Sequence, residues 1–236
     1  MRNHAKLVYS LAAAFGLFSC VGLPTAELKA SAELRRKASQ FPIEPYAGDQ
    51  LQLAEKNFVS GSNAYSNHHA QSAKALDAAF VGFEKALAIG LPRYFSDHQR
   101  VAYSNWRRAD EIFASVCMSN RYQNAQTLYQ GAQQAFNQAL VGLVPEASNS
   151  ASGFYPRSER PRSAKARALF DQAQAARREA LLAAAQQITV AEHEFSLVMK
   201  EARIKKERAE NLIDRVLKRE REAERRGAET ASRANP

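Results

Sequence analysis

Side chains that could do chemistry are few in this chain. It has two cysteines, Cys20 and Cys117, and five histidines. Cys20 directly follows an uncharged, largely apolar run over residues 7–19, which Arg2 and Lys6 precede. A basic segment followed by a run of this length is typical of a secretory signal, and the run is shorter than the ~20 apolar residues that cross a bilayer. The segment before Cys20 therefore predicts that the protein is exported from the cytoplasm.

The residues before Cys20 resemble the signal of bacterial lipoproteins. Leu17 and Ser19 match the leucine and the small residue that this family carries at positions −3 and −1, whereas Phe18 departs from its small or β-branched position −2. Signals with such a loose pattern occur in spirochaetes. The resemblance implies that residues 1–19 are removed and that Cys20 is lipidated. It implies a cell-envelope protein held by lipid on the periplasmic or surface face of a bacterial membrane.

Two alternatives to lipidation stay open. Ordinary cleavage at a small-x-small site would give a secreted protein, although the sites at residues 24–26 and 28–30 have Pro24 and Leu28 at position −3. An uncleaved anchor, or a misassigned start, is the other alternative.

The remaining reactive residues do not form a known catalytic or metal-binding pattern. His68 and His69 are adjacent, so they would point to different faces of a helix, and His193-Glu194 has no second histidine four residues on. There is neither a glycine-rich phosphate loop nor a Gly-x-Ser-x-Gly elbow. Cys117 follows an apolar stretch and is expected to be a buried free thiol. We expect no enzymatic activity, no metal and no cofactor.

Composition predicts an all-α protein. Ala, Gln, Glu, Arg and Lys are abundant, and no segment alternates apolar and polar residues as a strand would. The net charge is +9, or +7 without Arg2 and Lys6. Export argues against a nucleic-acid partner, and the mixed signs of the charges favour a solvated surface.

The expected organisation follows from helix-breaking residues. Residues 20–47 are predicted to be a tether, in which residues 33–37 form one or two helical turns and Pro42 and Pro45 break any helix. Asp49 is expected to cap the first helix of a region of antiparallel helical hairpins over residues 48–145. The later helices of this region are expected at about residues 72–89, 96–118 and 124–141.

One motif occurs twice within this region at an offset of 53 residues. The shared pattern is two alanines around a phenylalanine, then a leucine and a proline: Ala79, Phe83, Ala86, Leu87 and Pro92, then Ala132, Phe136, Ala139, Leu140 and Pro145. It resembles the second helix of a tetratricopeptide repeat, which implies a protein-interaction scaffold with a concave groove. The sequence departs from that family in its period, which is about 34 residues there, in its first helices and in the late prolines. Any antiparallel helical bundle could reuse the same spacing.

Residues 146–163 are rich in Ser, Gly and Pro and predict a linker, and residues 164–227 predict one long helix before a disordered tail at 228–236. The helix carries a heptad pattern, with steps alternating between three and four residues: Leu181, Ala184, Ile188, Ala191, Phe195, Val198, Ala202, Lys205, Ala209, Leu212 and Val216. The first half is apolar enough to pack on the preceding helices. The second half is expected to project as a charged helix, or to form a weak coiled coil with a partner or with itself.

These features favour a cell-envelope lipoprotein that binds another envelope protein. The expected binding surface is either the C-terminal helix or a hairpin groove with an aromatic and arginine cluster: Tyr65, Trp106, Arg107, Arg108 and Tyr129. The alternative for Trp106 is a place in a helix–helix seam. The alternative function is an envelope module that binds a lipid or small ligand and contacts anionic membrane through its basic C-terminal helix. A surface protein without a specific ligand is a third possibility.

Overall fold

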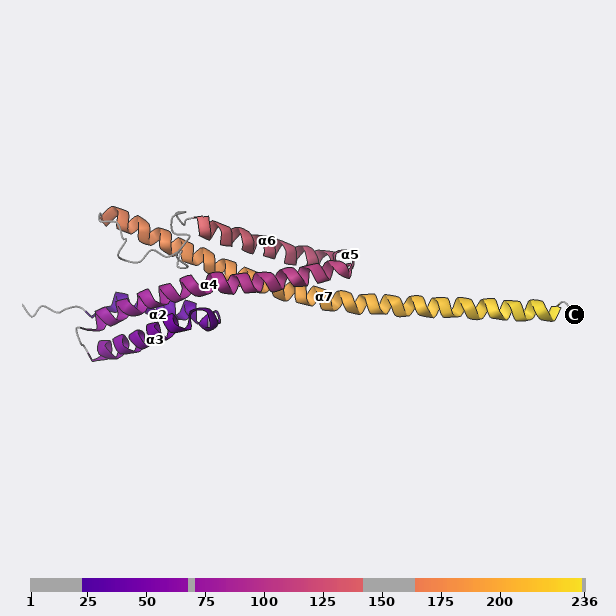
Figure 1. Ribbon diagram of the computed structural model, residues 1–236, viewed down its shortest axis with the longest axis horizontal. Helices are drawn as coiled ribbons and strands as arrows, with labels where there is room; N and C mark the ends of the chain where they lie inside the picture. Colours follow the sequence, from indigo (N-terminus) through magenta and orange to yellow (C-terminus); the bar gives the residue numbers. More distant parts are fainter. Residues whose placement is uncertain (1–22, 68–70, 142–163, 235–236) are drawn as a thin grey trace, which may run out of the picture. The chain divides into compact units, whose positions relative to one another are not determined.

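The computed structural model describes residues 23–67, 71–141 and 164–234, and all regular structure in these ranges is α-helical (Figure 1). The predicted signal 1–19, Cys20, Pro145 and the predicted linker 146–163 lie outside the described residues. The helices are Thr25–Ala38 (α2), Glu44–Ser66 (α3), Ser72–Glu111 (α4), Ala114–Cys117 (α5), Ser119–Val141 (α6) and Ala164–Ala234 (α7). The predicted all-α class, with antiparallel helical hairpins and a long charged C-terminal helix, is confirmed.

The helices form two compact units, and the boundary lies inside α4, between Leu91 and Pro92. The N-terminal unit contains α2, α3 and the first part of α4. The C-terminal unit contains the rest of α4 with α5, α6 and α7. The predicted hairpin region 48–145 therefore contributes helices to both units.

Close contact between α3 and α4 shapes the N-terminal unit. A Cβ added at Gly82 would lie 2.8 Å from the Cβ atom of Ala54, and one at Gly61 would lie 2.9 Å from the backbone nitrogen of Leu76. Later residues of α4 thus meet earlier residues of α3, so the two helices are antiparallel. The absence of side chains at these glycines lets the backbones approach closely. In the same unit, the first copy of the repeated motif is buried from Ala79 to Leu87.

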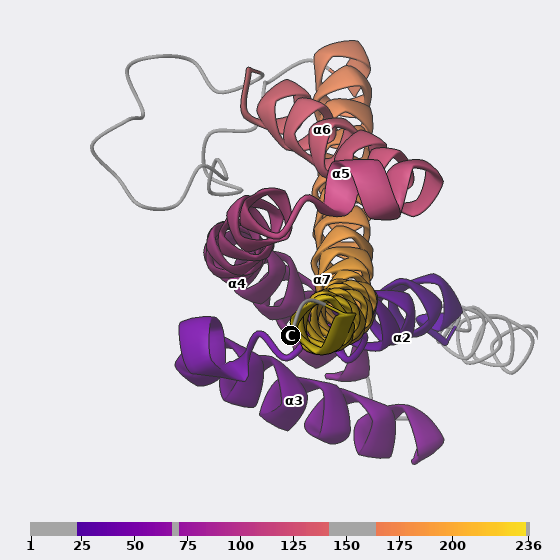
Figure 2. The ribbon, with the colours of Figure 1, turned by 90° about the vertical axis from the view of Figure 1, so that its right-hand side faces the viewer.

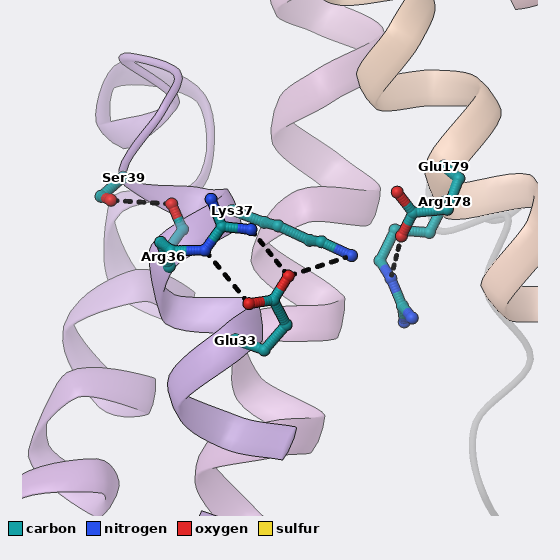
Figure 3. Close-up of polar contacts among 6 residues, drawn as sticks. All are labelled: Glu33, Arg36, Lys37, Ser39, Arg178 and Glu179. Atoms are coloured by element: carbon teal, nitrogen blue, oxygen red, sulfur yellow. Dashed lines mark hydrogen bonds and ion pairs between the residues drawn. The ribbon is translucent and has the colours of Figure 1, made fainter. Parts of the chain in front are cut away.

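The prediction of a largely non-helical tether is wrong for residues 25–38, which form α2. Ser31, Leu34 and Ala38 share one face of this helix and are buried, so α2 gains stability by packing rather than from propensity alone. Glu33 bonds to Arg36 and Lys37, and the Ser39 hydroxyl donates to the Arg36 carbonyl at the C-terminal end of the helix (Figure 3).

The next helix, α3, begins earlier than Asp49. It starts at Glu44 and has Pro45 in its first turn, where the missing amide hydrogen of proline costs nothing because first-turn amides have no helical acceptor. Ala47 interrupts the helix locally, with φ −144° and ψ 30°. Pro45 therefore starts a short helical turn before this break, and the long segment of α3 follows Ala47, close to the predicted cap Asp49.

Two predicted helices are joined, because Pro92 does not end a helix. α4 passes through Gly90 and Pro92, although proline in a helix interior removes one backbone hydrogen bond and costs about 3 kcal/mol. Packing on either side offsets this cost, since Leu91 is buried in the N-terminal unit and Tyr94 and Phe95 are buried in the C-terminal unit. The tetratricopeptide resemblance stays a prediction.

In the C-terminal unit, α7 packs against both α4 and α6. Phe95 stacks on Phe136 with ring centroids 4.0 Å apart, which joins α4 to α6. Tyr94 and His98 of α4 bond to Thr189 and Glu192 of α7. Figure 1 shows α7 continuing past the ends of α4 and α6 in this unit, and Figure 2 views α7 from its C-terminal end. It runs to Ala234, so the predicted helix end at Gly227 and disordered tail are wrong for residues 228–234.

The turn between α4 and α6 is sharp and contains the short helix α5. Phe113 has φ 57°, in the left-handed region that L-residues with large side chains rarely adopt. The predicted helix over residues 96–118 is therefore divided at Phe113. Since 66% of Phe113 and 77% of Val116 are exposed, the turn presents apolar side chains to solvent. Cys117 is also exposed, which corrects the expectation that its thiol is buried.

The glycine contact between α3 and α4 predicts that Gly82→Ala destabilises the protein. The new methyl group would meet Ala54, whose Cβ and Cα cannot move without a shift of the backbone. We expect a loss of about 1–3 kcal/mol in the free energy of unfolding, measured by chemical denaturation. Gly131→Ala in α6 is the matched control, since its Cβ would have only an ordinary contact at 3.6 Å with Gln187. It should be neutral or stabilising through helix propensity, and an equal loss in both variants would contradict the packing argument.

Candidate protein-interaction surface

The core of the C-terminal unit is an aromatic cluster around Phe195. Trp106 lies parallel to the Phe195 ring at a centroid distance of 5.9 Å, and Tyr122 and Tyr129 meet it edge-on at 6.1 and 6.5 Å. Phe195 is fully buried. Because these rings come from α4, α6 and α7, the cluster joins all three helices.

A polar chain lies beside these rings. The Trp106 indole N–H donates to the Tyr122 hydroxyl at 2.5 Å, and that hydroxyl donates to the Asp110 carboxylate. Burial raises the pKa of Tyr122 above its ordinary value, and the hydrogen bond to Asp110 raises it further. Burial likewise raises the pKa of Tyr129. The neutral phenols are therefore the forms that fit this core.

Ion pairs connect α6 to α7 near the end of the packed region. Arg121 donates to Glu194 at 3.2 Å and also to Glu201. Hydrogen bonding to Glu201 is the main cause that raises the pKa of Arg121. Glu194 and Glu201 lie seven residues apart on one side of α7. A single guanidinium thus bonds to side chains from residues two helical turns apart, which helps to fix the register of α6 against α7.

The structure separates the predicted surface residues. Trp106 is half-buried in the helix–helix seam and Tyr129 is only 5% exposed, so both belong to the core. Arg107 and Arg108 are exposed on α4, and Tyr65 is half-buried in the N-terminal unit. The seam alternative for Trp106 is thus confirmed, and Tyr129 does not form part of an exposed groove.

The heptad stripe of α7 divides sharply at Ala202. Every stripe residue from Leu181 to Ala202 is buried, and those from Ala184 onward belong to the core of the C-terminal unit, which confirms that this half is packed. From residue 203 to residue 226 every side chain is exposed, which confirms the predicted projecting charged helix. We call residues 203–226 the arm. At 1.5 Å per residue the arm is about 36 Å long.

The arm keeps an apolar stripe although nothing in the described part of the chain covers it. Its large apolar side chains are between about two-fifths and two-thirds exposed: Ile204, Leu212, Ile213, Val216 and Leu217. With 100° per residue, Ala209, Leu212 and Val216 continue the face that is buried before Ala202. The same face of one helix is therefore covered in the body and bare in the arm.

Charges on the arm are unequally distributed around this stripe. Ten Lys or Arg residues and six Asp or Glu residues lie between 203 and 226. At one edge of the stripe lie Arg208, Arg215 and Glu222, and at the other lie Lys206, Glu210, Glu220 and Glu224, whereas Arg219 continues the stripe itself. The arm is thus amphipathic, with charges of both signs at each edge of its apolar stripe.

The turn at α5 marks the place where the cover of α7 ends. The Lys205 ammonium donates to the Cys117 carbonyl at 2.9 Å. Lys205 is the first exposed position of the heptad stripe, so α5 lies on the stripe side of α7 at this level. The sequence gives no signal for the exposed Phe113 and Val116, because the turn that exposes them falls inside a continuous helical pattern.

No other type of site stands out in the described ranges. No group of three or more His, Cys, Asp or Glu side chains is placed there to hold a metal ion. None of the helices in those ranges has a stretch apolar enough over its length to cross a bilayer. Comparisons with known protein families, curated proteins and solved structures find no match to the chain. The exposed apolar stripe makes the arm the candidate site.

The environment of Tyr122 predicts the alkaline stability of the protein. The folded state holds the Tyr122 proton to a higher pH than the unfolded state, in which the pKa is about 10. The contribution of Tyr122 to stability is therefore fully present below pH 10 and is lost as the pH rises toward the raised pKa. Tyr122→Phe should lower the free energy of unfolding by about 1 kcal/mol at pH 7 and make its decline above pH 10 shallower.

Denaturant unfolding between pH 7 and 11 measures both effects. Phe195→Leu is the control, because it weakens the same cluster without removing a phenol and should keep the wild-type slope above pH 10. If the free energy of unfolding of Tyr122→Phe declined above pH 10 as steeply as that of the wild type, Tyr122 would not be the source of the alkaline loss of stability.

Proposed function

We propose that this protein is a non-enzymatic interaction scaffold of a bacterial cell envelope, tethered through Cys20, which presents the arm of α7 to a protein partner. The observation that carries the proposal is the heptad stripe that continues, uncovered, beyond Ala202. A helical protein partner would cover this stripe as α4 and α6 cover the same face within the body.

Energetics favour a covered arm over a bare one. Full burial of a Leu, Ile or Val side chain stabilises by about 1.5–3 kcal/mol, and the arm exposes several. Within the arm, ion pairs such as Lys206–Glu210 at 3.9 Å support the helix by only about 0.2–0.5 kcal/mol each. A long helix gains most of its stability from packing, so a partner helix would stabilise the arm far more than these pairs do.

The tether rests on the sequence around Cys20. Cleavage before Cys20 and lipidation would hold the folded units at a membrane surface, where partners in the same envelope meet them at high local concentration. The arm could then find its partner without high intrinsic affinity.

Expression of the full chain with its own leader tests the tether. We expect intact-mass spectrometry to find a mature chain that begins at Cys20 and carries the mass of a diacylglycerol group, and Cys20→Ala to lose both features. Cys117→Ala is the control and should leave them unchanged. Cleavage at a later residue without lipid, unaffected by Cys20→Ala, would contradict the tether.

The arm also supports a second candidate function. The basic residues Arg208, Arg215 and Arg219, which lie in and beside the apolar stripe, suit the surface of an anionic membrane. A membrane-binding arm would make the protein a lipid-contacting module rather than a scaffold. The acidic residues among the charges of the arm, such as Glu210, Glu220 and Glu222, favour a protein surface over a uniformly anionic one.

A photo-reactive residue at position 212 separates the two functions. In cells, the probe at position 212 should form an adduct with a protein, and an excess of the unmodified chain should reduce the yield of this adduct. The same probe at Val190, an exposed apolar position outside the stripe, should form none. The unlipidated chain should not cosediment with anionic vesicles at 150 mM salt. Salt-sensitive cosedimentation, with no protein adduct from position 212, would contradict the scaffold and support the membrane module.

A further inference from the structure

We propose that the partner of the arm is a second copy of this chain, paired antiparallel through residues 205–223. This inference rests on the proposed function, because it names the protein that covers the stripe. The pairing would be a two-fold symmetric, two-helix coiled coil centred at residue 214, in which Leu212 of each copy faces Val216 of the other.

The charged residues within the stripe favour a second copy in this orientation. Lys205 and Arg219 occupy stripe positions. In a parallel pair, each of them would face the same residue of the second copy, so like charges would meet within the stripe. In the antiparallel pair, Lys205 faces Ala223 and Arg219 faces Ala209 of the second copy. A small alanine opposite each long basic side chain leaves room for its aliphatic stem and lets its charge reach solvent.

The edges of the stripe are complementary in the same register. Lys206 comes opposite Glu220 of the second copy, and Arg208 comes opposite Glu222, so two-fold symmetry gives four attractive pairs. Ile213 faces its own copy at the centre and adds apolar contact. Arg215 also approaches its own copy, at an exposed edge where solvent and salt weaken the repulsion.

The length of the arm suits such a pair. Residues 203–226 span more than three heptads, about the minimum for a heptad pattern to indicate a coiled coil. In this register, the second copy would begin to cover α7 at the level where α5, the last covering element of the same chain, ends. Lys205 bonds to α5, so Ala223 of the second copy would arrive beside this turn, where Phe113 and Val116 are exposed.

Sedimentation equilibrium of the full chain, with Cys20 and Cys117 replaced by serine, tests whether the chain self-associates. We expect a monomer–dimer equilibrium, and Leu212→Asp combined with Val216→Asp should raise the dimer dissociation constant by at least about tenfold. These positions are exposed, so the fold should survive. Val190→Asp is the matched control, since Val190 is an exposed apolar residue of α7 outside the stripe, and it should leave dimerisation unchanged. A chain that stays monomeric would overturn the proposal. So would a dimer whose dissociation constant is unchanged by the Leu212→Asp and Val216→Asp substitutions.

Single-cysteine chains test the orientation. Oxidation of an equimolar mixture of Leu212→Cys and Val216→Cys chains should give mainly the mixed disulfide, because these positions face each other across the antiparallel pair. Like-with-like disulfides would indicate a parallel pair and overturn the register. Lys206→Glu should weaken the dimer, and Glu220→Lys in the same chain should restore it. Failure of restoration would also overturn the register.

The outcomes separate this inference from the proposed function. If the chain is monomeric while the photo-reactive residue at position 212 still captures a different envelope protein, the self-pairing is wrong and the scaffold stands. If the chain neither dimerises nor forms any adduct through the arm, both are wrong.

Discussion

The buried face of α7 is the constraint on which the C-terminal unit depends. Phe195 lies at its centre, and rings from α4 and α6 surround it. The face is built from large residues separated by alanines, so the helices can pack closely while the phenylalanine fills the space between them. The ion pairs of Arg121 and the contact of His98 with Glu192 lie around this cluster and fix its register.

The proposed function rests on the same face of α7, at the residues where α4 and α6 no longer cover it. Beyond Ala202 the stripe continues, but the helices that cover it have ended, and α5 closes the body at Lys205. The sequence thus places one kind of surface in two settings, a core in the body and an exposed stripe in the arm. In the proposed pairing, the basic residues of the stripe and the charges of both signs at its edges determine which partner and which orientation would suit the arm.

Periodicity predicted the parts of the fold in which one helix face decides burial. The heptad from Leu181 to Ala202 and the exposed arm both follow from the spacing and polarity of their residues. Local breakers were less informative, because Pro92 lies inside a helix held by packing on both sides, and Phe113 makes a turn that no glycine or proline announces. Aromatic residues near arginines suggested a surface, yet Tyr129 is buried, since sequence alone does not show which side of a helix its neighbours cover.

Amide hydrogen exchange along α7 of the full chain measures the central claim, that one continuous stripe is covered within the chain up to Ala202 and by another molecule beyond it. Slow exchange at residues 181–202 should be independent of protein concentration. Exchange at residues 203–226 should be fast in dilute protein and should slow as the concentration rises. Equal protection of both segments in dilute protein, or an arm that exchanges rapidly at every concentration, would contradict the account.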